Sequence, residues 1–510
     1  MSNSENNKRL AKNTILLYVR MVLMMLVSLY TSRVVLQVLG ITDFGIYNVV
    51  GGVITMLGCI NGSLSGSTSR FITFELGKGN IESVTRVFRC ASTIHYVLAI
   101  LVLILAETVG LWFVMNKMVI PGERQFAALC VYQFSVVTYT VSILNVPFNA
   151  LIIAHEKMDV FAAISIVEAI SKLLLVSILG LINADRLILY ALLMLVVQLS
   201  IQLIYICFCK KNFKESSVKW LWDKHISHNI LTYTFWTFNG SIAVLGYTQG
   251  LNILLNLFFG PVVNAARGIA IQVQTAVNQF FMNFQVAVRP QVTKAYAQGN
   301  LSYMNTLVFA SSRYSFYLII LVLFPLFINT EYVLYLWLGF VPKYSVAFVQ
   351  LMLIVCIDTA LAGPTLMAIH ATGDIKRFQI IEGSILLTIL PIAYLLLKYV
   401  HIQPETVLVV YIVIEYITQF VRVLIVFPRV KMSLMLYLKS VCFPIIMVFI
   451  PILLLGYTLY YNFEVASFCD FLVSCMICFT SSVFFIFTLG LNKQEKVFVF
   501  NKLKSFFLKK

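Results

Sequence analysis

The sequence carries little charge for its length. Only 11% of its 510 residues are charged, whereas soluble domains carry about 25%. Hydrophobic residues make up 60%, and the mean hydropathy is +0.91. We therefore predict an integral membrane protein. In a soluble protein the net charge of +16 would suggest binding to nucleic acid. In a membrane protein its meaning depends on where the basic residues lie.

Two motifs that a pump or a secreted protein needs are also missing. No phosphate-binding GxxxxGK[ST] occurs and no stretch resembles a soluble domain, which excludes an ATP-driven pump. The chain opens with the polar segment MSNSENNKRLAKN and has no signal cleavage site, so we expect the first span to remain as an anchor. Cys475 and Cys478 form a CxxC inside an apolar run, where packing is the expected role rather than redox or zinc chemistry.

Long apolar runs are what the sequence has instead. Runs of about 20 apolar residues, separated by charged residues, Gly, Pro and Asn, predict fourteen membrane-spanning helices. The predicted spans are 13–38, 45–67, 90–115, 125–153, 161–183, 186–209, 230–258, 262–288, 306–329, 344–370, 378–400, 405–427, 437–460 and 466–490. The fold class is thus an all-α polytopic membrane protein.

The basic residues between the spans predict the orientation. With the N-terminus in the cytoplasm, 26 of the 37 Lys and Arg residues fall in inner segments and 5 in outer segments. Positive residues accumulate on the cytoplasmic side of membrane proteins. We therefore expect both termini to be cytoplasmic, and the basic excess to be a topology signal.

An internal repeat divides the chain. At an offset of 220 residues Thr73 matches Thr293, and the pair Gly79, Asn80 matches Gly299, Asn300. Further matches at that offset are Gly40 with Gly260, Val53 with Val273 and Thr55 with Thr275; at an offset of 217, Pro147, Ala154 and Phe161 match Pro364, Ala371 and Phe378. Six spans separate the copies, so the repeat is parallel and predicts two six-helix lobes around a central site.

The predicted domains follow from this repeat. They are an N-terminal lobe at 1–209, a basic cytoplasmic linker at 210–229, a C-terminal lobe at 230–427, and two added helices with a basic tail at 428–510. The linker contains Trp220 and Trp222 among lysines. Two interpretations stay open for it: a segment on the inner membrane surface, where anionic lipid attracts such residues, or a solvated connection.

The stretch from Gly260 to Gly299 has an unusual polar face. At 100° per residue its Arg267, Gln274, Asn278, Gln285 and Arg289 fall within about 60° of one another. Since an arginine near the centre of a spanning helix costs roughly 2.5 to 3.5 kcal/mol, such a stripe faces protein or water and not lipid. We expect it to line a cavity.

The second span is rich in small residues. Gly51, Gly52, Gly58, Gly62 and Gly66 lie in or near it. Small residues allow helices to pack closely, and close packing is the expected explanation here, with hinge motion as the alternative.

Two segments resemble a known family. They are NTILLYVRMVLMMLVSLYTSRVVLQVLGITDFGIYNVVGG and LNLFFGPVVNAARGIA with AVRPQVTKAYAQGN. Both look like polysaccharide transporters of the multidrug, oligosaccharidyl-lipid and polysaccharide exporter superfamily, and most of all like its O-antigen (Wzx-type) flippases. The resemblance implies a V-shaped two-lobe fold that moves an undecaprenyl-diphosphate-linked oligosaccharide to the outer leaflet by alternating access. It also implies a bacterial inner membrane protein of lipopolysaccharide synthesis, with polysaccharide assembly proteins as partners.

Arginines are the expected substrate-binding residues. A guanidinium binds phosphate oxygens in a bidentate way, and related lipid flippases place arginines on comparable spans. The candidates for binding the diphosphate are Arg20, Arg33, Arg70, Arg267 and Arg289, together with Gln274 and Asn278. Arg70 and Arg289 fall one residue apart under the repeat, so they could form a pair at the inner mouth. The alternative for each arginine is an interaction with lipid headgroups.

Buried carboxylates are the expected ion-coupling residues. Asp358 lies near the middle of its span with no basic residue close to it in the sequence, and Glu415 is the second candidate. Glu168 has Lys172 one turn further on, which indicates a structural pair. No cofactor or metal is expected, and transport would depend on a proton or sodium gradient or on the membrane potential.

Two other functions remain as alternatives. An ion-coupled multidrug or cation antiporter of the same superfamily would be expected to have a predominantly acidic or apolar lumen, whereas this chain has arginines. An integral membrane enzyme of polysaccharide assembly would need catalytic groups gathered at one surface, but the outer loops are short and the six histidines are scattered.

Overall fold

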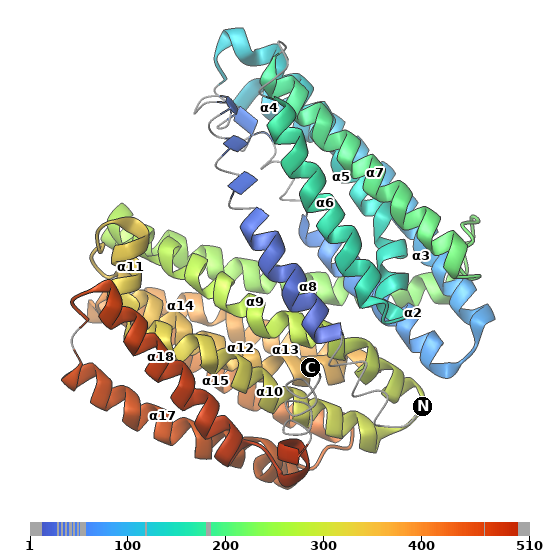
Figure 1. Cartoon of the computed structure of the whole chain (residues 1–510). Helices are drawn as coiled ribbons and strands as arrows, with labels where there is room; N and C mark the ends of the chain where they lie inside the picture. Colours follow the sequence, from blue (N-terminus) through green and yellow to red (C-terminus); the bar gives the residue numbers. More distant parts are fainter. Residues whose placement is uncertain are drawn as a thin grey trace, which may run out of the picture. The chain divides into compact units, whose positions relative to one another are not determined.

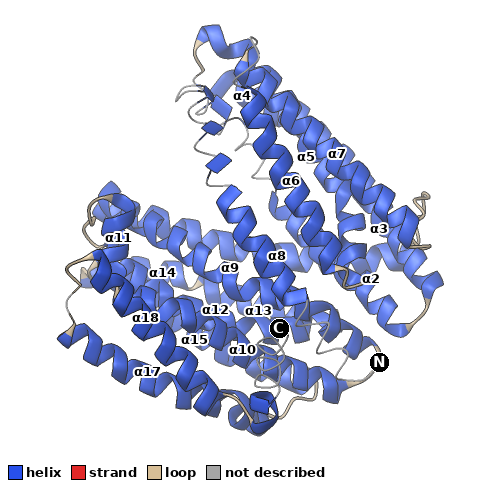
Figure 2. Cartoon of the chain, in the orientation of Figure 1, coloured by secondary structure: helices blue, strands red, loops and turns tan. Residues whose placement is uncertain are grey.

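The computed structural model describes most of the chain. The described residues are 13–27, 30–31, 34–35, 38–39, 43, 46–47, 50, 58–117, 120–179, 185–463 and 465–497. They form helices joined by short turns, and no strand occurs among them (Figure 2). The predicted all-α class is confirmed.

The helices of the first half begin with an apolar helix at Asn13–Val27. Next come α2 (Gly58–Lys78), α3 (Ile81–Leu105), η1 (Ala106–Gly110), α4 (Leu111–Lys117), η2 (Gly122–Arg124), α5 (Gln125–Ala154), α6 (Met158–Leu179) and α7 (Arg186–Asn212). Figure 1 shows α5, α6 and α7 as long neighbouring helices, and α5 packs closely against both α3 and α7.

The second half opens with the two longest helices, α8 (Lys224–Phe259) and α9 (Pro261–Ala297). After them come α10 (Leu301–Ile328), α11 (Thr330–Leu338), α12 (Ser345–Thr372), α13 (Lys376–Leu387), α14 (Ile389–Leu395), η3 (Leu396–Val400) and α15 (Pro404–Arg429). The chain continues with α16 (Leu434–Tyr437), η4 (Leu438–Cys442), α17 (Phe443–Asn462), α18 (Phe468–Phe485) and η5 (Ile486–Gly490).

These helices match the predicted spans. From residue 90 onward, every predicted span coincides with one described helix or with a run of consecutive helical segments. Ten helices of the described chain are long and apolar enough to cross a membrane, and Asn13–Val27 is a shorter apolar helix. The protein is therefore a multi-pass membrane protein.

The chain forms two compact units. Unit 1 comprises 1–241, 289–299 and 373–376; unit 2 comprises 242–288, 300–372 and 377–510. Both α8 and α9 contribute to each unit, so the units divide these helices and do not coincide with lobe boundaries drawn between spans. The predicted lobes and linker stay a prediction.

The repeat is visible as matching local structure. Gly79 (φ 77°) and Gly299 (φ 72°) both adopt the left-handed conformation that ends a helix. The next residue caps the following helix in each copy: the Asn80 side chain accepts a hydrogen bond from the Ser83 amide, and Asn300 from Tyr303, both at 3.1 Å. The two copies therefore turn from one span to the next in the same way.

The segment 213–223 between α7 and α8 is not helical, and it is anchored to α3 and the end of α5. Arg89 donates to the Ser217 hydroxyl at 2.6 Å, and Arg86 forms an ion pair with Asp223 at 2.7 Å. His155, in the turn after α5, lies 2.5 Å from Glu215 and stacks on Phe213. The segment is thus anchored to unit 1, and both interpretations of the linker stay predictions. Trp220 and Trp222 remain exposed, at 69% and 51%.

Gly62 and Gly66 of α2 do not support the packing interpretation. A methyl group added at Gly62 or Gly66 would meet no atom of the described residues within 4 Å, so no contact among them requires glycine at these two positions. Gly51 and Gly52 lie outside the described residues. Glycine is required for close packing at other positions of both units. In unit 1 a methyl group at Gly77 would lie 2.8 Å from Cβ of Ala297, and in unit 2 a methyl group at Gly363 would collide with Oε1 of Gln285.

The two C-terminal helices present an apolar surface. In the first half of α17 the exposed side chains include Phe443, Ile446, Met447, Ile450 and Leu453, and α18 exposes a similar set. Exposed apolar side chains in a membrane protein are compatible with lipid. These helices give a reference for what a lipid-facing surface looks like in this molecule.

Candidate functional site

Arg267 is the most unusual residue of α9. Its side chain is 1% exposed and is held by α8: its Nε donates to Oδ1 of Asn252 at 2.5 Å, and its Nη2 to the Thr248 carbonyl at 3.3 Å. Its Nη1 is buried and has no hydrogen-bond partner. No carboxylate forms an ion pair with it among the described residues. Arg267 is thus a buried cation held only by neutral acceptors.

A hollow lies beside Arg267, at the junction of α8 and α9. Its volume is about 270 Å³, and Asn252, which holds the arginine, forms part of its wall. Its lining residues are mostly amides: Gln249, Asn252, Ile253, Asn256, Leu257 and Asn264. The hollow therefore presents neutral hydrogen-bonding groups next to an uncompensated positive charge.

A cluster of buried charges centres on Arg422 of α15. Its Nε lies 2.5 Å from Glu382, its Nη1 lies 3.5 Å from Asp358, and its Nη2 lies 3.6 Å from Glu415. These carboxylates come from α13, α12 and α15. Oδ1 of Asp358 is buried without a hydrogen-bond partner. Three carboxylates around one guanidinium leave negative charge in excess in a medium of low dielectric, which favours uptake of a proton or a cation.

The carboxylate cluster and the Arg267 site are connected through α8. The Tyr247 hydroxyl donates to Oε1 of Glu415 at 3.0 Å, and the next residue, Thr248, binds Arg267 through its carbonyl. Tyr411 packs against Tyr247 with 5.5 Å between the ring centroids, and both tyrosines lie within electrostatic reach of Arg267. A movement of this part of α8 would alter both sites.

The predicted polar stripe of α9 is turned mainly into protein. Gln285 is buried, and its Nε2 donates to Ser315 at 3.1 Å and to the Ala360 carbonyl at 3.2 Å. Gln274 and Asn278 are half-buried, and Oδ1 of Asn278 has no hydrogen-bond partner. The expectation that the stripe avoids lipid fits these positions. Arg267 and Gln285, however, are buried against neighbouring helices, and neither belongs to the lining of the hollow between α8 and α9.

The predicted inner pair has a common neighbour in unit 1. The Arg70 guanidinium lies over the rings of Phe71 and Phe74, at 4.5 and 4.9 Å, and 5.6 Å from the ring centroid of Tyr233. Arg289 is exposed and also lies within electrostatic reach of Tyr233. The structure thus brings both arginines to one tyrosine.

The two remaining predicted arginines are in the first span. Arg20 is half-buried, and its guanidinium lies 4.4 Å from the ring centroid of Phe161. Its Nε is buried without a hydrogen-bond partner. Arg33 lies outside the described residues. The predicted pair of Glu168 and Lys172 is present, with 2.6 Å between Oε1 and Nζ.

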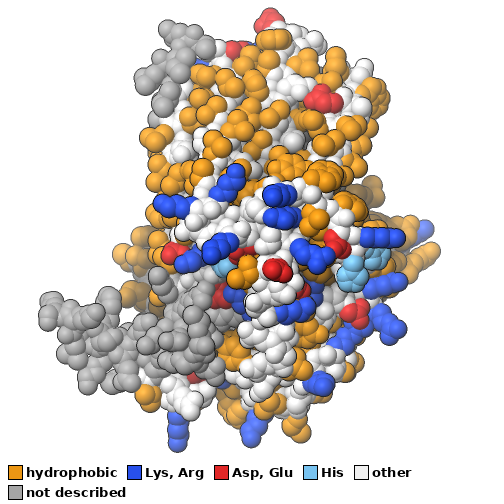
Figure 3. Space-filling view, turned by 90° about the vertical axis from the view of Figure 1, so that its right-hand side faces the viewer, with side chains coloured by type: hydrophobic (Ala, Val, Ile, Leu, Met, Phe, Trp, Pro, Cys, Tyr) orange, Lys and Arg blue, Asp and Glu red, His pale blue; other side chains and the backbone are white. Residues whose placement is uncertain are grey.

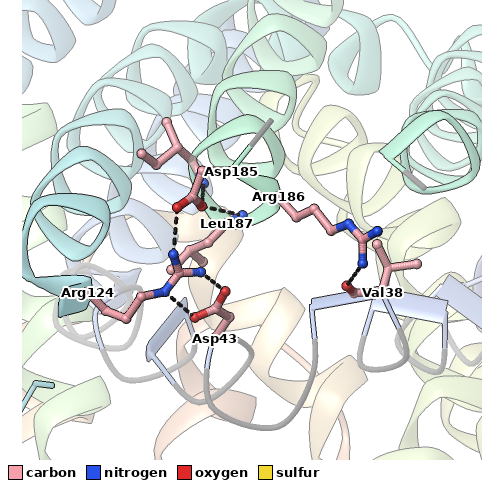
Figure 4. Close-up of polar contacts among 7 residues, drawn as sticks. Val38, Asp43, Arg124, Asp185, Arg186 and Leu187 are labelled. Atoms are coloured by element: carbon pink, nitrogen blue, oxygen red, sulfur yellow. Dashed lines mark hydrogen bonds and ion pairs between the residues drawn. The ribbon is translucent and has the colours of Figure 1, made fainter. Parts of the chain in front are cut away.

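An ionic contact not foreseen from the sequence holds three segments together at one end of unit 1 (Figure 4). Arg124 forms ion pairs with Asp43 and Asp185. Asp185 also caps α7 by accepting from the Leu187 amide at 3.0 Å, and Arg186 donates to the Val38 carbonyl at 3.2 Å. Arg124, Asp185 and Arg186 lie at the ends of η2 and α7, so we assign this cluster a structural role.

Sequence reasoning missed Arg422, Glu382 and Tyr247. Asp358 has no basic neighbour within its own helix, yet Arg422 reaches it from a helix 64 residues later. The position of Arg422 within a predicted span could have indicated a buried ion pair, because a charge inside the membrane needs a partner of opposite charge. Which acid it would meet depends on helix packing, and the sequence does not contain that information.

No protein-family model and no curated protein sequence matches this chain. Among solved structures, it is similar to an outward-facing multidrug resistance MATE family transporter of the MOP superfamily, with a TM-score of 0.72 and 14% identity. A MATE mutant gives a TM-score of 0.73 at 13% identity. In both comparisons the alignment covers 84% of this chain and 96% of the other.

The chain has the MATE transporter fold. A further structure with this fold is a MOP superfamily transporter from Pyrococcus furiosus, with a TM-score of 0.72 and 14% identity, described as having a binding pocket of reverse polarity that suggests a different function. At such identities the likeness concerns the fold alone. It agrees with the predicted superfamily and does not distinguish the flippase branch from the others.

Proposed function

We propose that this protein is a flippase. Its substrate would be an undecaprenyl-diphosphate-linked oligosaccharide, moved by alternating access from the cytoplasmic to the outer leaflet for synthesis of a cell-surface polysaccharide such as O-antigen. The MATE fold supports transport as the general activity. The choice of substrate rests on the charges of the site.

The observation that carries the proposal is the uncompensated charge of Arg267. A buried guanidinium with neutral neighbours raises the free energy of the empty site, and an arriving anion lowers it. A diphosphate is a concentrated anion, and the hollow beside Asn252 would place it near Nη1, the nitrogen without a partner. Arg289, exposed in unit 1 and 22 residues further along α9, offers a second cation for the same anion at another stage of its path.

The cluster around Arg422 supplies a means of energy coupling. We assign Asp358 and Glu415 to binding the coupling ion, with Glu382 as a third acid of the same cluster. Because Tyr247 connects Glu415 with the helix that holds Arg267, uptake of the ion and release of the anion would influence each other.

The location proposed is the bacterial inner membrane, with both termini in the cytoplasm. Figure 3 shows one face of the molecule, on which Lys and Arg side chains gather below a largely hydrophobic surface. The anchored segment 213–223 and the exposed Trp220 and Trp222 fit a position at the inner membrane surface. Polysaccharide assembly proteins are the partners we propose.

A multidrug or cation antiporter is the main rival, since solved structures of this fold include a multidrug transporter. The excess of acidic groups around Arg422 would suit a cation, whereas Arg267 would repel it. A membrane enzyme of polysaccharide assembly is the second rival. Substrates of opposite charge separate the two transport functions.

The test uses purified protein in proteoliposomes. Translocation is measured for a fluorescent undecaprenyl-diphosphate oligosaccharide and, in parallel, for a cationic dye. The proposal predicts movement of the lipid-linked sugar and no export of the dye. Dye export without movement of the lipid would refute it, and conversion of the lipid to a new product would favour the enzyme.

A further inference from the structure

The exposed face of α9 in unit 2 differs from the predicted stripe. Its exposed residues include Gly268, Gln272, Thr275, Gln279 and Met282, at helical spacings of three and four. At 100° per residue they lie about 100° around the helix from Arg267 and Gln285, which face into the unit. The open surface of α9 therefore carries a line of polar side chains, Gln272, Thr275 and Gln279, among small and apolar residues and next to the buried stripe.

Two glutamines of this stripe are unfavourable in lipid. Side-chain amides of Gln272 and Gln279 make no hydrogen bond with another described residue, and in hydrocarbon such groups would remain unsatisfied. The exposed central residues of α17 are all apolar by comparison. The stripe of α9 thus faces water or a polar ligand.

The stripe is continuous with the hollow. Asn264, one turn before Gly268, lines the hollow together with Gln249, Asn252 and Asn256 of α8. From Asn264 to Gln279 the helix rises about 22 Å, the length of several sugar rings. Over this distance the surface offers amide and hydroxyl groups and no formal charge, beginning beside the Arg267 cation.

We propose that this amide stripe, from Asn264 to Gln279 with the facing amides of α8, binds the sugar chain of the transported lipid. This inference rests on the proposed function. An amide side chain both donates and accepts, which matches sugar hydroxyls, and the lack of charge suits neutral sugars. Single hydrogen bonds of this kind are weak, so the sugar chain can move along the stripe while the diphosphate stays beside Arg267.

The test compares two substrates in the same protein. Gln272→Leu/Gln279→Leu is reconstituted, and the rate is measured for undecaprenyl diphosphate bearing the oligosaccharide of the expressing cells and for undecaprenyl diphosphate without sugar. Two neutral hydrogen bonds are worth about 1.4 kcal/mol or more in total, so the rate for the glycosylated lipid should fall about tenfold. The rate for the bare lipid should not change.

A matched control addresses the added leucines. Thr275 and Thr480 of α18 are both exposed, and each hydroxyl donates to the carbonyl four residues earlier, at 2.8 and 2.7 Å. Thr480→Leu should leave both rates unchanged, whereas Thr275→Leu should slow the glycosylated lipid alone. An equal fall for both lipids in the double variant, or no fall, would overturn the inference.

Failure of the proposed function would be recognised separately. If the wild-type protein moves neither lipid, binding of the free oligosaccharide to the detergent-purified protein is measured by saturation-transfer NMR. Transfer that is lost in Gln272→Leu/Gln279→Leu would support a sugar-binding stripe without flippase activity. Transfer that is equal in both proteins, or absent from the wild type, would overturn it.

Discussion

The two units use their charges in different ways. Unit 1 places several ionic contacts near the ends of its helices: Arg124 with Asp43 and Asp185 at one end, and His155 with Glu215 and Lys294 with Glu156 around the turn after α5. Unit 2 instead buries Arg422 with three carboxylates, and Arg267 with none.

This difference separates structural from functional charges. A contact at helix ends joins loops and tolerates water, so each charge there has a fixed opposite partner. Charges inside a membrane-spanning unit are costly unless opposite charges compensate them. In the described part of unit 2 Arg267 lacks a carboxylate, and the three carboxylates around Arg422 share a single cation. The missing charges are those that a mobile anion and a mobile cation would supply. We infer that unit 2 carries the main binding chemistry of transport, with Arg289 of unit 1 as a second cation.

The largest expected effect comes from making the same substitution in both units. Arg422→Leu leaves three carboxylates without a cation, and removing one partner of a buried pair costs about 3 to 5 kcal/mol. Arg124→Leu removes a partly exposed contact, which is worth about 1 kcal/mol. Thermal unfolding in detergent should show a much larger loss for Arg422→Leu, with partial recovery in Arg422→Leu/Asp358→Asn. Equal losses would contradict the division of roles.

The second prediction concerns coupling. Asp358→Asn removes the acid whose Oδ1 has no hydrogen-bond partner, while Arg422 keeps Glu382 and Glu415. The protein should fold normally, and its transport rate should no longer respond to an imposed proton or sodium gradient. The measurement compares the rate with and without each gradient, and the gradient that accelerates the wild type identifies the ion. An unchanged response would remove Asp358 from the coupling site.

The third prediction concerns packing. Gly363→Ala would force Gln285 away from Ser315 and the Ala360 carbonyl, and overpacking of this kind costs about 1 to 3 kcal/mol. Gly66→Ala in unit 1 meets open space and should be neutral, or stabilising by up to about 1 kcal/mol through helix propensity. Unfolding temperatures of the two variants, measured side by side, check this, and a destabilised Gly66→Ala would show that its surroundings are tighter.

The smallest effect is expected at the turn after α5. Burial lowers the pKa of His155 below its usual 6.5, although Glu215 acts in the opposite direction. His155 then binds a proton more readily in the unfolded chain than in the folded protein. Its contribution to the free energy of unfolding is therefore complete above about pH 6.5, and it is lost as the pH falls through the pKa of His155 in the folded protein. His155→Asn should reduce the decline in unfolding temperature between pH 7 and pH 5. An identical decline would place its origin elsewhere.

The sequence predicted the helices well and the site only in part. Apolar runs and the repeat identified the spans, because the membrane requires long apolar helices and Gly79 and Gly299 require a special backbone. Periodicity alone could not tell which polar face of α9 would be buried. Gln285 is buried because Gly363 leaves space for it, whereas Gln272 has no such space among the described residues. Gly363 belongs to a different helix and lies 78 residues further along the chain, so the periodicity of α9 does not reveal it.

The ion-pair partners of the buried acids could not be predicted from the sequence for a similar reason. Asp358 and Glu415 were identified as acids within spans, but their common partner Arg422 became apparent only when α12, α13 and α15 were packed together. The contact of Arg124 likewise joins three segments that are distant in sequence.

The central claim is that Arg267 is a cation waiting for the diphosphate of the substrate. Binding of undecaprenyl diphosphate to the detergent-purified protein tests it most directly, with the wild type, Arg267→Gln and, as a control, Arg186→Gln at an exposed arginine of unit 1. The account predicts that Arg267→Gln weakens binding at least about tenfold, equivalent to 1.4 kcal/mol, while Arg186→Gln binds like the wild type. Equal affinity of Arg267→Gln and wild type would contradict it.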